Sequence, residues 1–179
     1  MGIENRGAES SGILAVDMLT KVPYAMHAAR HGTQLSKKVV IYTNGDEALA
    51  AEFVTAFAGS PVFSADSRKI KKLVKGPEKA EVILQFEDST ETTEAWLGHA
   101  PLTKAKGPFA EQLGLASTPM GDLVANPPFS QSSEKGVFVA GDNSAPVKIT
   151  PNALYTGSLA GAGVSAQLLA EKLGQPSMV

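Results

Sequence analysis

The carboxylate of Asp142 directly follows a short apolar run, Gly-Val-Phe-Val-Ala-Gly at residues 136–141. Residues 137–139 predict a buried strand, and Gly141 allows another group to approach the backbone closely. At the carboxyl end of such a strand, where open α/β sheets bind ligands, a carboxylate can accept hydrogen bonds from sugar or ribityl hydroxyls. The alternative is a strand-to-loop turn in which Asp142 binds local backbone N–H groups. The local residues leave both interpretations open.

Two histidines have the spacing of paired metal ligands. His27 and His31 lie one turn apart on a helix predicted over residues 23–35. Two imidazoles at this spacing can bind one metal ion, but no glutamate between them and no third ligand accompanies them. We therefore expect an exposed helix face and no metal site.

The composition limits the classes of function. The 179 residues carry a net charge of −2 and include no cysteine, which excludes disulfides, thiolate metal sites and thiol nucleophiles within this sequence. The only basic cluster, residues 68–79, is interleaved with apolar residues and diluted by Glu78 and Glu81, so we expect a solvated face and no nucleic acid. No apolar run approaches transmembrane length and no secretory signal is visible, so we expect a cytoplasmic protein without membrane contact.

The order of predicted elements indicates an α/β fold. Strands at residues 10–16 and 38–43 flank the helix at 23–35, a βαβ unit that requires a parallel sheet. A helix at 47–58 follows, and the next three strands have the pattern of a small antiparallel meander. A short helix or turn and a linker rich in proline and glycine come before Asp142. The predicted meander strands are residues 69–75, 80–87 and 93–97, the short helix or turn is residues 107–115, and the linker is residues 119–128.

Several segments in one register resemble a known family. Residues 136–142, the following Pro-Val-Lys-Ile-Thr-Pro-Asn-Ala at 146–153 and the Gly/Ala-rich helix at 157–163 resemble the C-terminal FAD-binding segment of thioredoxin-reductase-like flavoproteins. Residues 11–15 and 39–45 resemble the first two strands of that family's pyridine-nucleotide domain. The most similar branch is fungal and oxidises dithiols in secondary-metabolite pathways, as in gliotoxin-type biosynthesis.

The resemblance implies a Rossmann-like pyridine-nucleotide domain over residues 1–115 and a C-terminal FAD-domain segment, a strand plus the Gly/Ala-rich helix, over residues 116–179. It also implies FAD as the cofactor, a small dithiol or disulfide as the substrate, and a homodimer in the full-length protein. His99, in a junction similar to the family's Gly-His-x-Pro, has either a structural role or a role near the flavin. The residues implied for cofactor binding are Gly141 and Asp142 at the ribityl chain, and Ile149, Thr150, Asn152 and Ala153 at the isoalloxazine, where a helix N-terminus stabilises negative charge.

The sequence departs from the family in two places that matter for activity. Members carry an N-terminal Gly-rich motif for the FAD pyrophosphate and a redox Cys-x-x-Cys pair, and this chain has neither. Residues 2–4, Gly-Ile-Glu, match the end of the string that follows the second cysteine in the fungal branch, so the sequence is expected to begin just downstream of that pair. No catalytic residue is therefore assigned, and the alternative function is a truncated, non-catalytic remnant or interaction module.

The case for NADPH is left open. A dinucleotide-binding βαβ unit carries a Gly-x-Gly-x-x-Gly/Ala turn, but residues 16–22 contain no glycine, and the basic cluster expected after the second strand is replaced by Thr-Asn-Gly-Asp at 43–46. The departure fits oxidase members that transfer electrons to oxygen. Residues 161–166 match the glycine pattern literally, but they lie inside a helical pattern. We expect those small residues to let the helix pack tightly against a sheet and the cofactor.

Overall fold

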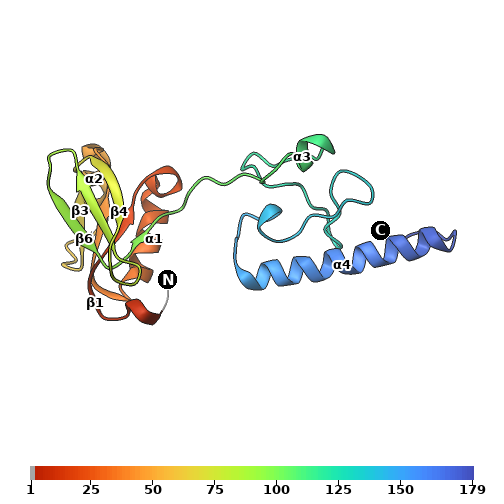
Figure 1. Ribbon diagram of the computed structural model, residues 1–179, viewed down its shortest axis with the longest axis horizontal. Helices are drawn as coiled ribbons and strands as arrows, with labels where there is room; N and C mark the ends of the chain where they lie inside the picture. The colour runs from red at the N-terminus through yellow and green to blue at the C-terminus, as the bar shows by residue number, and fades with distance from the viewer. Residues whose placement is uncertain (1–2) are drawn as a thin grey trace. The chain divides into compact units, whose positions relative to one another are not determined.

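The computed structural model describes residues 3–179 and divides into two compact units, Met1–Leu102 and Thr103–Val179 (Figure 1). Part of the predicted Gly-Ile-Glu match therefore lies outside the described residues, because Gly2 is not among them. The predicted domain boundary, between residues 115 and 116, falls within the second unit.

The first unit contains the βαβ arrangement that the sequence predicts. β1 (Ala8–Leu14) leads through α1 (Val22–Gly32) to β2 (Ser36–Tyr42), and the two strands pair in parallel. α1 begins where Pro23 fits its first turn, since proline has no N–H to leave unbonded there. The sequence pattern did not reveal β3 (Phe63–Asp66), which follows α2 (Glu47–Ala56) and pairs in parallel with β2. The sheet order is β3-β2-β1-β7, where β7 is Leu97–Gly98.

Alternate side chains of β2 face opposite layers, as the period of a strand requires. Val39 and Ile41 pack with α1 and α2 in the larger core cluster, which also contains Trp96. Val40 and Tyr42 belong instead to a second cluster, formed against a small antiparallel sheet. The parallel sheet of the first unit is therefore a middle layer, with helices on one face and the small sheet on the other.

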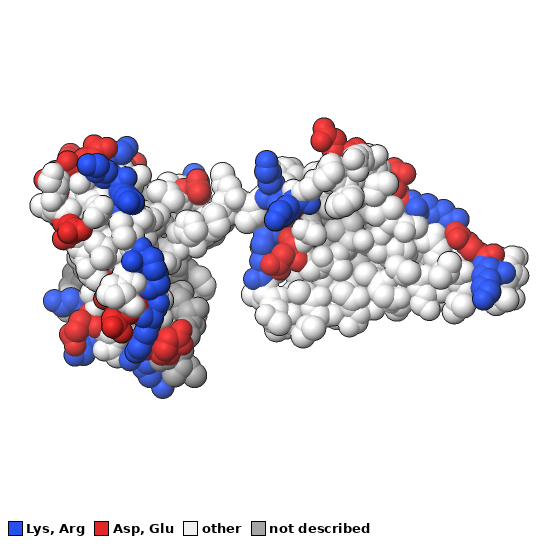
Figure 2. Space-filling model, in the orientation of Figure 1, with Lys and Arg blue, Asp and Glu red and all other residues white. Residues whose placement is uncertain are grey.

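The small sheet is the meander predicted from the sequence. β4 (Ile70–Lys75), β5 (Val82–Phe86) and β6 (Glu91–Glu94) pair antiparallel in the order β4-β5-β6. The predicted third strand is divided, since its last residue, Leu97, belongs to β7 in the parallel sheet. Lysine side chains of β4 are exposed, and Figure 2 shows basic residues along this part of the surface. This arrangement agrees with the solvated face expected for the basic cluster.

The second unit has little regular structure apart from one long helix. α3 (Phe109–Gln112) is a single turn within the segment expected to be a short helix or turn. α4 (Thr150–Lys172) contains the Gly/Ala-rich sequence, and η3 (Gly141–Asn143) is a 3₁₀ turn that carries Asp142. Across residues 3–179, no helix combines the length and the apolar character needed to cross a membrane. The other 3₁₀ turns are η1 (Ile3–Asn5) and η2 (Asp17–Thr20).

The prediction of a buried strand at residues 137–139 is wrong. Val139 is buried, but the segment makes only an isolated bridge, between Phe138 and Gln131. Two further backbone bonds tie it to residues 130–132: the Val139 N–H donates to the Ser130 carbonyl at 2.9 Å, and the Ser132 N–H donates to the Val137 carbonyl at 2.8 Å. An extended apolar segment becomes a strand only with a continuous partner, and this unit provides none among its described residues.

Candidate functional site

The loop that carries Asp142 leaves the carboxylate of this residue exposed. Gly141 has a φ of +70°, in the left-handed region that favours glycine, and its N–H donates to the Thr156 hydroxyl of α4 at 2.9 Å. Asp142 is exposed, and its carboxylate accepts no hydrogen bond from another described residue. The alternative in which Asp142 binds local N–H groups is therefore not what the structure shows. The carboxylate is free to accept hydrogen bonds from a hydroxylated ligand.

The start of α4 lies beside this loop. A Cβ placed on Gly141 would be 3.7 Å from the Cβ of Ala153, so the two predicted site residues are neighbours. Ile149 is the N-cap residue, and no side chain caps the first turn, which leaves its leading N–H groups without a side-chain acceptor. Asn152 instead directs its amide to the Val147 carbonyl at 3.1 Å. The helix begins at Thr150, before the Gly/Ala-rich residues 157–163.

A small pocket of about 150 Å³ adjoins Asp142. Sequence reasoning missed two of its charged residues, Asp122 and Lys148, whose side chains form an ion pair of 2.7 Å. Their separation of 26 positions along the chain gives no local signal that they meet. We call this cavity the Asp142 pocket; its lining residues are Thr103, Lys104, Ala105, Gly121, Asp122, Asp142, Asn143 and Lys148.

A second cavity, of about 460 Å³, lies in the first unit at the carboxyl ends of β1 and β2, where parallel sheets bind nucleotides. Its charged lining residues are Lys21, Asp46 and Glu52. Asp17, in the turn after β1, has a φ of +50° although it is not glycine, and the Asp46 carboxylate caps α2 by accepting the Leu49 N–H at 2.9 Å. Two carboxylates and one ammonium give this cavity a net negative lining, which disfavours the pyrophosphate of NADPH.

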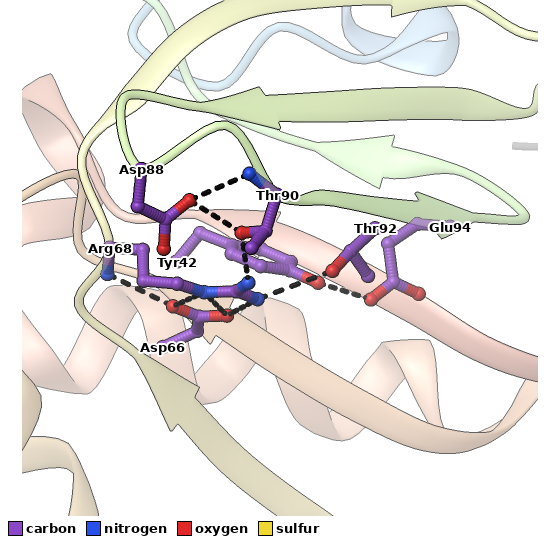
Figure 3. Close-up of polar contacts among 7 residues, drawn as sticks. All are labelled: Tyr42, Asp66, Arg68, Asp88, Thr90, Thr92 and Glu94. Carbon is purple, nitrogen blue, oxygen red and sulfur yellow. Dashed lines mark hydrogen bonds and ion pairs between the residues drawn. The ribbon is translucent and has the colours of Figure 1, made fainter.

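The guanidinium nearest that edge of the sheet is already bound. Arg68 pairs with Asp66, the last residue of β3, through both carboxylate oxygens and also donates to the hydroxyls of Thr90 and Thr92 (Figure 3). Its Cζ lies 3.9 Å from the centre of the Phe86 ring. Burial alone raises the pKa of Asp66, but the hydrogen bonds and charge of Arg68 hold it below its ordinary value. Arg68 therefore joins the two sheets, and most of its donors are already used within the protein.

A buried carboxylate lies next to this group. Glu94 on β6 is 1% exposed and accepts a hydrogen bond from the Tyr42 hydroxyl of β2 at 2.5 Å (Figure 3). Burial raises the pKa of Glu94, and the Asp66 carboxylate adds to the rise, although the bond from Tyr42 opposes it. Burial also raises the pKa of the Tyr42 phenol, so tyrosine stays protonated at neutral pH. Sequence reasoning missed this pair, because neither residue matches a motif.

The pKa of Glu94 gives a testable pH dependence. Because folding raises this pKa, the contribution of Glu94 to stability is complete below the unfolded pKa of about 4.3 and is lost as the pH rises through the folded value. We expect the free energy of unfolding of the unchanged protein to fall relative to that of Glu94→Gln across this range, by at most about 1.4 kcal/mol per pH unit. Urea unfolding of both proteins at several pH values measures the difference. A difference that does not vary with pH would contradict the assignment.

The histidines occupy exposed positions. His27 and His31 lie on the exposed face of α1 with ring centroids 4.6 Å apart, edge to face. Among residues 3–179, no group of three or more histidine, aspartate or glutamate side chains is arranged to hold a metal ion. His99 is exposed as well.

Three curated relatives cover almost the whole chain. Thioredoxin reductase tcpT of Claviceps purpurea is 45% identical over 177 residues, which are 99% of this chain and 55% of the relative. Thioredoxin reductase sirT of Leptosphaeria maculans is 35% identical over 94% of this chain, and thioredoxin reductase aclD of Aspergillus oryzae is 36% identical over 93%. The chain belongs to the thioredoxin reductase-like family. It spans only about half the length of these relatives. No protein-family model matches the sequence.

Two solved structures share the fold. A putative thioredoxin reductase TrxB from Bacillus anthracis has a TM-score of 0.73 at 20% identity, covering 93% of this chain and 53% of its own. An oxidoreductase from Agrobacterium tumefaciens has a TM-score of 0.70 at 22% identity, with 93% and 52% covered. The α/β fold and the family resemblance predicted from the sequence are confirmed.

Proposed function

We propose that this chain forms the C-terminal half of an FAD-dependent oxidoreductase that acts on a dithiol in fungal secondary metabolism. The observation that carries the proposal is the exposed, unbonded carboxylate of Asp142 beside the uncapped start of α4. The family relationship to fungal thioredoxin reductases supports the same reaction class. The chain contains no cysteine, so the thiol-exchange residues must come from another polypeptide segment.

The residues of the second unit would hold FAD in two ways. The Asp142 carboxylate would accept hydrogen bonds from ribityl hydroxyls. Gly141, which has no side chain, would let the ligand approach the backbone closely there. The backbone at Ile149 and Thr150, with the first turn at Asn152 and Ala153, would face the isoalloxazine. The positive end of α4 favours negative charge there. When bound, FAD would accept the two electrons that a pair of thiols loses on forming a disulfide.

We further propose that oxygen, not NADP, accepts the electrons. Two thiols lose two electrons and two protons as their S–S bond forms, and dioxygen takes up both electrons and both protons to become hydrogen peroxide. The supporting observation is the acidic lining of the cavity at the carboxyl ends of β1 and β2, where Asp46 and Glu52 outnumber the single Lys21. The ion pair between Arg68 and Asp66 further supports oxygen as the acceptor, because it uses donors that could otherwise bind a phosphate of NADPH.

The exposed apolar side chains of α4 point to a covering partner. Leu154, Leu168 and Leu169 are each more than half exposed, and Figure 2 shows a broad uncharged surface on the second unit. We propose that this face is covered in a complete protein by the portion of the fold that the relatives have and this sequence does not match, and that the complete protein is a cytoplasmic homodimer. The alternative function is a non-catalytic remnant or interaction module, which would need neither flavin nor thiols.

Flavin content separates the two functions. We expect the purified 179-residue chain to be colourless, because the pyrophosphate site is missing and one ribityl contact contributes only about 1.5–3 kcal/mol.

With the upstream half of the Claviceps purpurea relative fused before Gly2, the protein should show visible flavin absorbance. It should also oxidise a small dithiol with one hydrogen peroxide formed per disulfide and no need for NADPH. A folded fusion without flavin would favour the remnant.

A further inference from the structure

Lys148 binds the backbone of the loop that carries Asp142. Its ammonium donates to the Asp142 carbonyl at 2.6 Å, to the Ala145 carbonyl at 3.1 Å and to a carboxylate oxygen of Asp122 at 2.7 Å. An ammonium has three donors on a tetrahedral nitrogen, and here all three are used. The Lys148 side chain is 28% exposed and that of Asp122 is 9% exposed, so solvent screens their attraction less than it would at an open surface.

The same contacts connect two loops on the wall of the Asp142 pocket. The Asp122 carbonyl accepts the Thr118 N–H at 2.7 Å, and the neighbouring Leu123 N–H donates to the Asn143 carbonyl, also at 2.7 Å. Two contacts therefore connect residues 118–123 with the 141–145 loop. One is the bond from the Leu123 N–H to Asn143, and the other runs through Lys148, which binds both Asp122 and the loop carbonyls. On the opposite side, Thr156 of α4 accepts the Gly141 N–H.

We propose that Lys148, paired with Asp122, is a positioning residue that fixes the 141–145 loop so that the Asp142 carboxylate stays exposed to the ligand. Glycine at position 141 can adopt many backbone conformations, so without other contacts the loop would be ordered only when a ligand binds. The conformational entropy lost in that ordering would weaken binding. Contacts that order the loop beforehand avoid this loss. This role rests on the proposed flavin site, and Lys148, whose three donors are all bonded within the protein, would act through Asp142.

The hold on the loop can be measured in the 179-residue chain without flavin. In Lys148→Met, which keeps the length of the side chain but removes its charge and donors, we expect the amides of Ser144 and Leu123 to exchange hydrogen roughly tenfold faster or more. Lys135→Met is the matched control, since Lys135 forms an exposed ion pair with Glu171 in the same unit. The buried Gln167 on α4 should exchange as before in both variants.

A second variant guards against an unfolded result. Lys148→Met leaves the Asp122 carboxylate buried without its partner, whereas the double variant Asp122→Asn with Lys148→Met removes both charges. The loop contacts of Lys148 are absent in both, so both should exchange faster at Ser144 while the exchange of Gln167 is unchanged. Unchanged exchange at Ser144 and Leu123 in a folded double variant would overturn the proposal.

A double-mutant cycle tests the path through Asp142 in the flavin-loaded fusion protein. Lys148→Met alone should weaken flavin binding roughly fivefold to tenfold, and it should add almost nothing when Asp142 is already alanine. Full additivity of the two substitutions would overturn the positioning role. If Asp142→Ala alone leaves flavin affinity unchanged, the proposed flavin site fails instead, and the exchange experiment still decides whether Lys148 orders the loop.

Discussion

Replacing Asp142 by alanine in the flavin-loaded fusion protein is expected to weaken flavin binding by about ten- to a hundredfold. The carboxylate is exposed and accepts no bond from another described side chain or backbone group, so its removal leaves no protein donor unpaired. The whole effect should therefore come from lost charge-assisted bonds to the ligand, at about 1.5–3 kcal/mol. Equilibrium dialysis, with the free flavin measured by its fluorescence in the protein-free compartment, gives the dissociation constants.

Glu111→Ala is the control for Asp142→Ala. Glu111 is an exposed carboxylate on α3 in the same unit, and it does not line the Asp142 pocket. Its replacement should change the flavin dissociation constant less than twofold, as expected for an exposed charge. Equal retention of flavin by Asp142→Ala and the unchanged protein would show that the ribityl assignment is wrong.

Gly163→Ala is expected to destabilise the second unit, whereas Gly161→Ala, two residues away on α4, should stabilise it. A Cβ on Gly163 would lie 2.6 Å from the Cβ of Phe129 and 2.6 Å from a ring carbon of Phe138, which is closer than real Cβ atoms approach. The cost of such overpacking is roughly 1–3 kcal/mol. A Cβ on Gly161 meets nothing within 4 Å, so alanine there should add about 0.5–1 kcal/mol through helix propensity alone.

Far-ultraviolet circular dichroism during urea unfolding measures both effects, because α4 is the longest helix among the described residues. The comparison is sensitive because the two substitutions add the same atom to the same helix. Two stabilising substitutions would mean that Phe129 and Phe138 do not pack against Gly163. Two destabilising ones would mean that Gly161 is also in contact.

The sequence predicted most of the first unit because its signals are local. The strands predicted at residues 10–16 and 38–43 contain the apolar runs Ile-Leu-Ala-Val and Val-Val-Ile-Tyr, as in strands buried on both faces, and the structure shows β2 between two hydrophobic clusters. Pro23 located the start of α1 because proline has no N–H to leave unbonded in a first helical turn. β3 escaped notice because its four residues, Phe-Ser-Ala-Asp, are too short and mixed to show a period.

The second unit was harder to predict because its structure depends on contacts distant in the chain. Residues 137–139 have the composition of a strand, but strand formation needs hydrogen-bond partners that sequence composition does not reveal. The ion pair between Lys148 and Asp122 likewise joins residues far apart in the chain, and the composition around either residue does not predict it. The small residues of α4 were expected to pack against a sheet and the cofactor, but among its glycines only Gly163 has close neighbours, the side chains of Phe129 and Phe138, and a Cβ on Gly161 would meet nothing within 4 Å.

The apolar surface of α4 also has a consequence for how long such a chain survives in a cell. Leu154, Tyr155 and Leu173 are each at least 63% exposed, and the helix buries only Gly163 and Gln167. Chaperones and proteases recognise uncovered leucine-rich segments of this kind, and their binding removes chains from the usable pool. Abundance in the cell would therefore depend on how quickly α4 is covered after synthesis, so that turnover, and not chemistry, would set the amount of active protein.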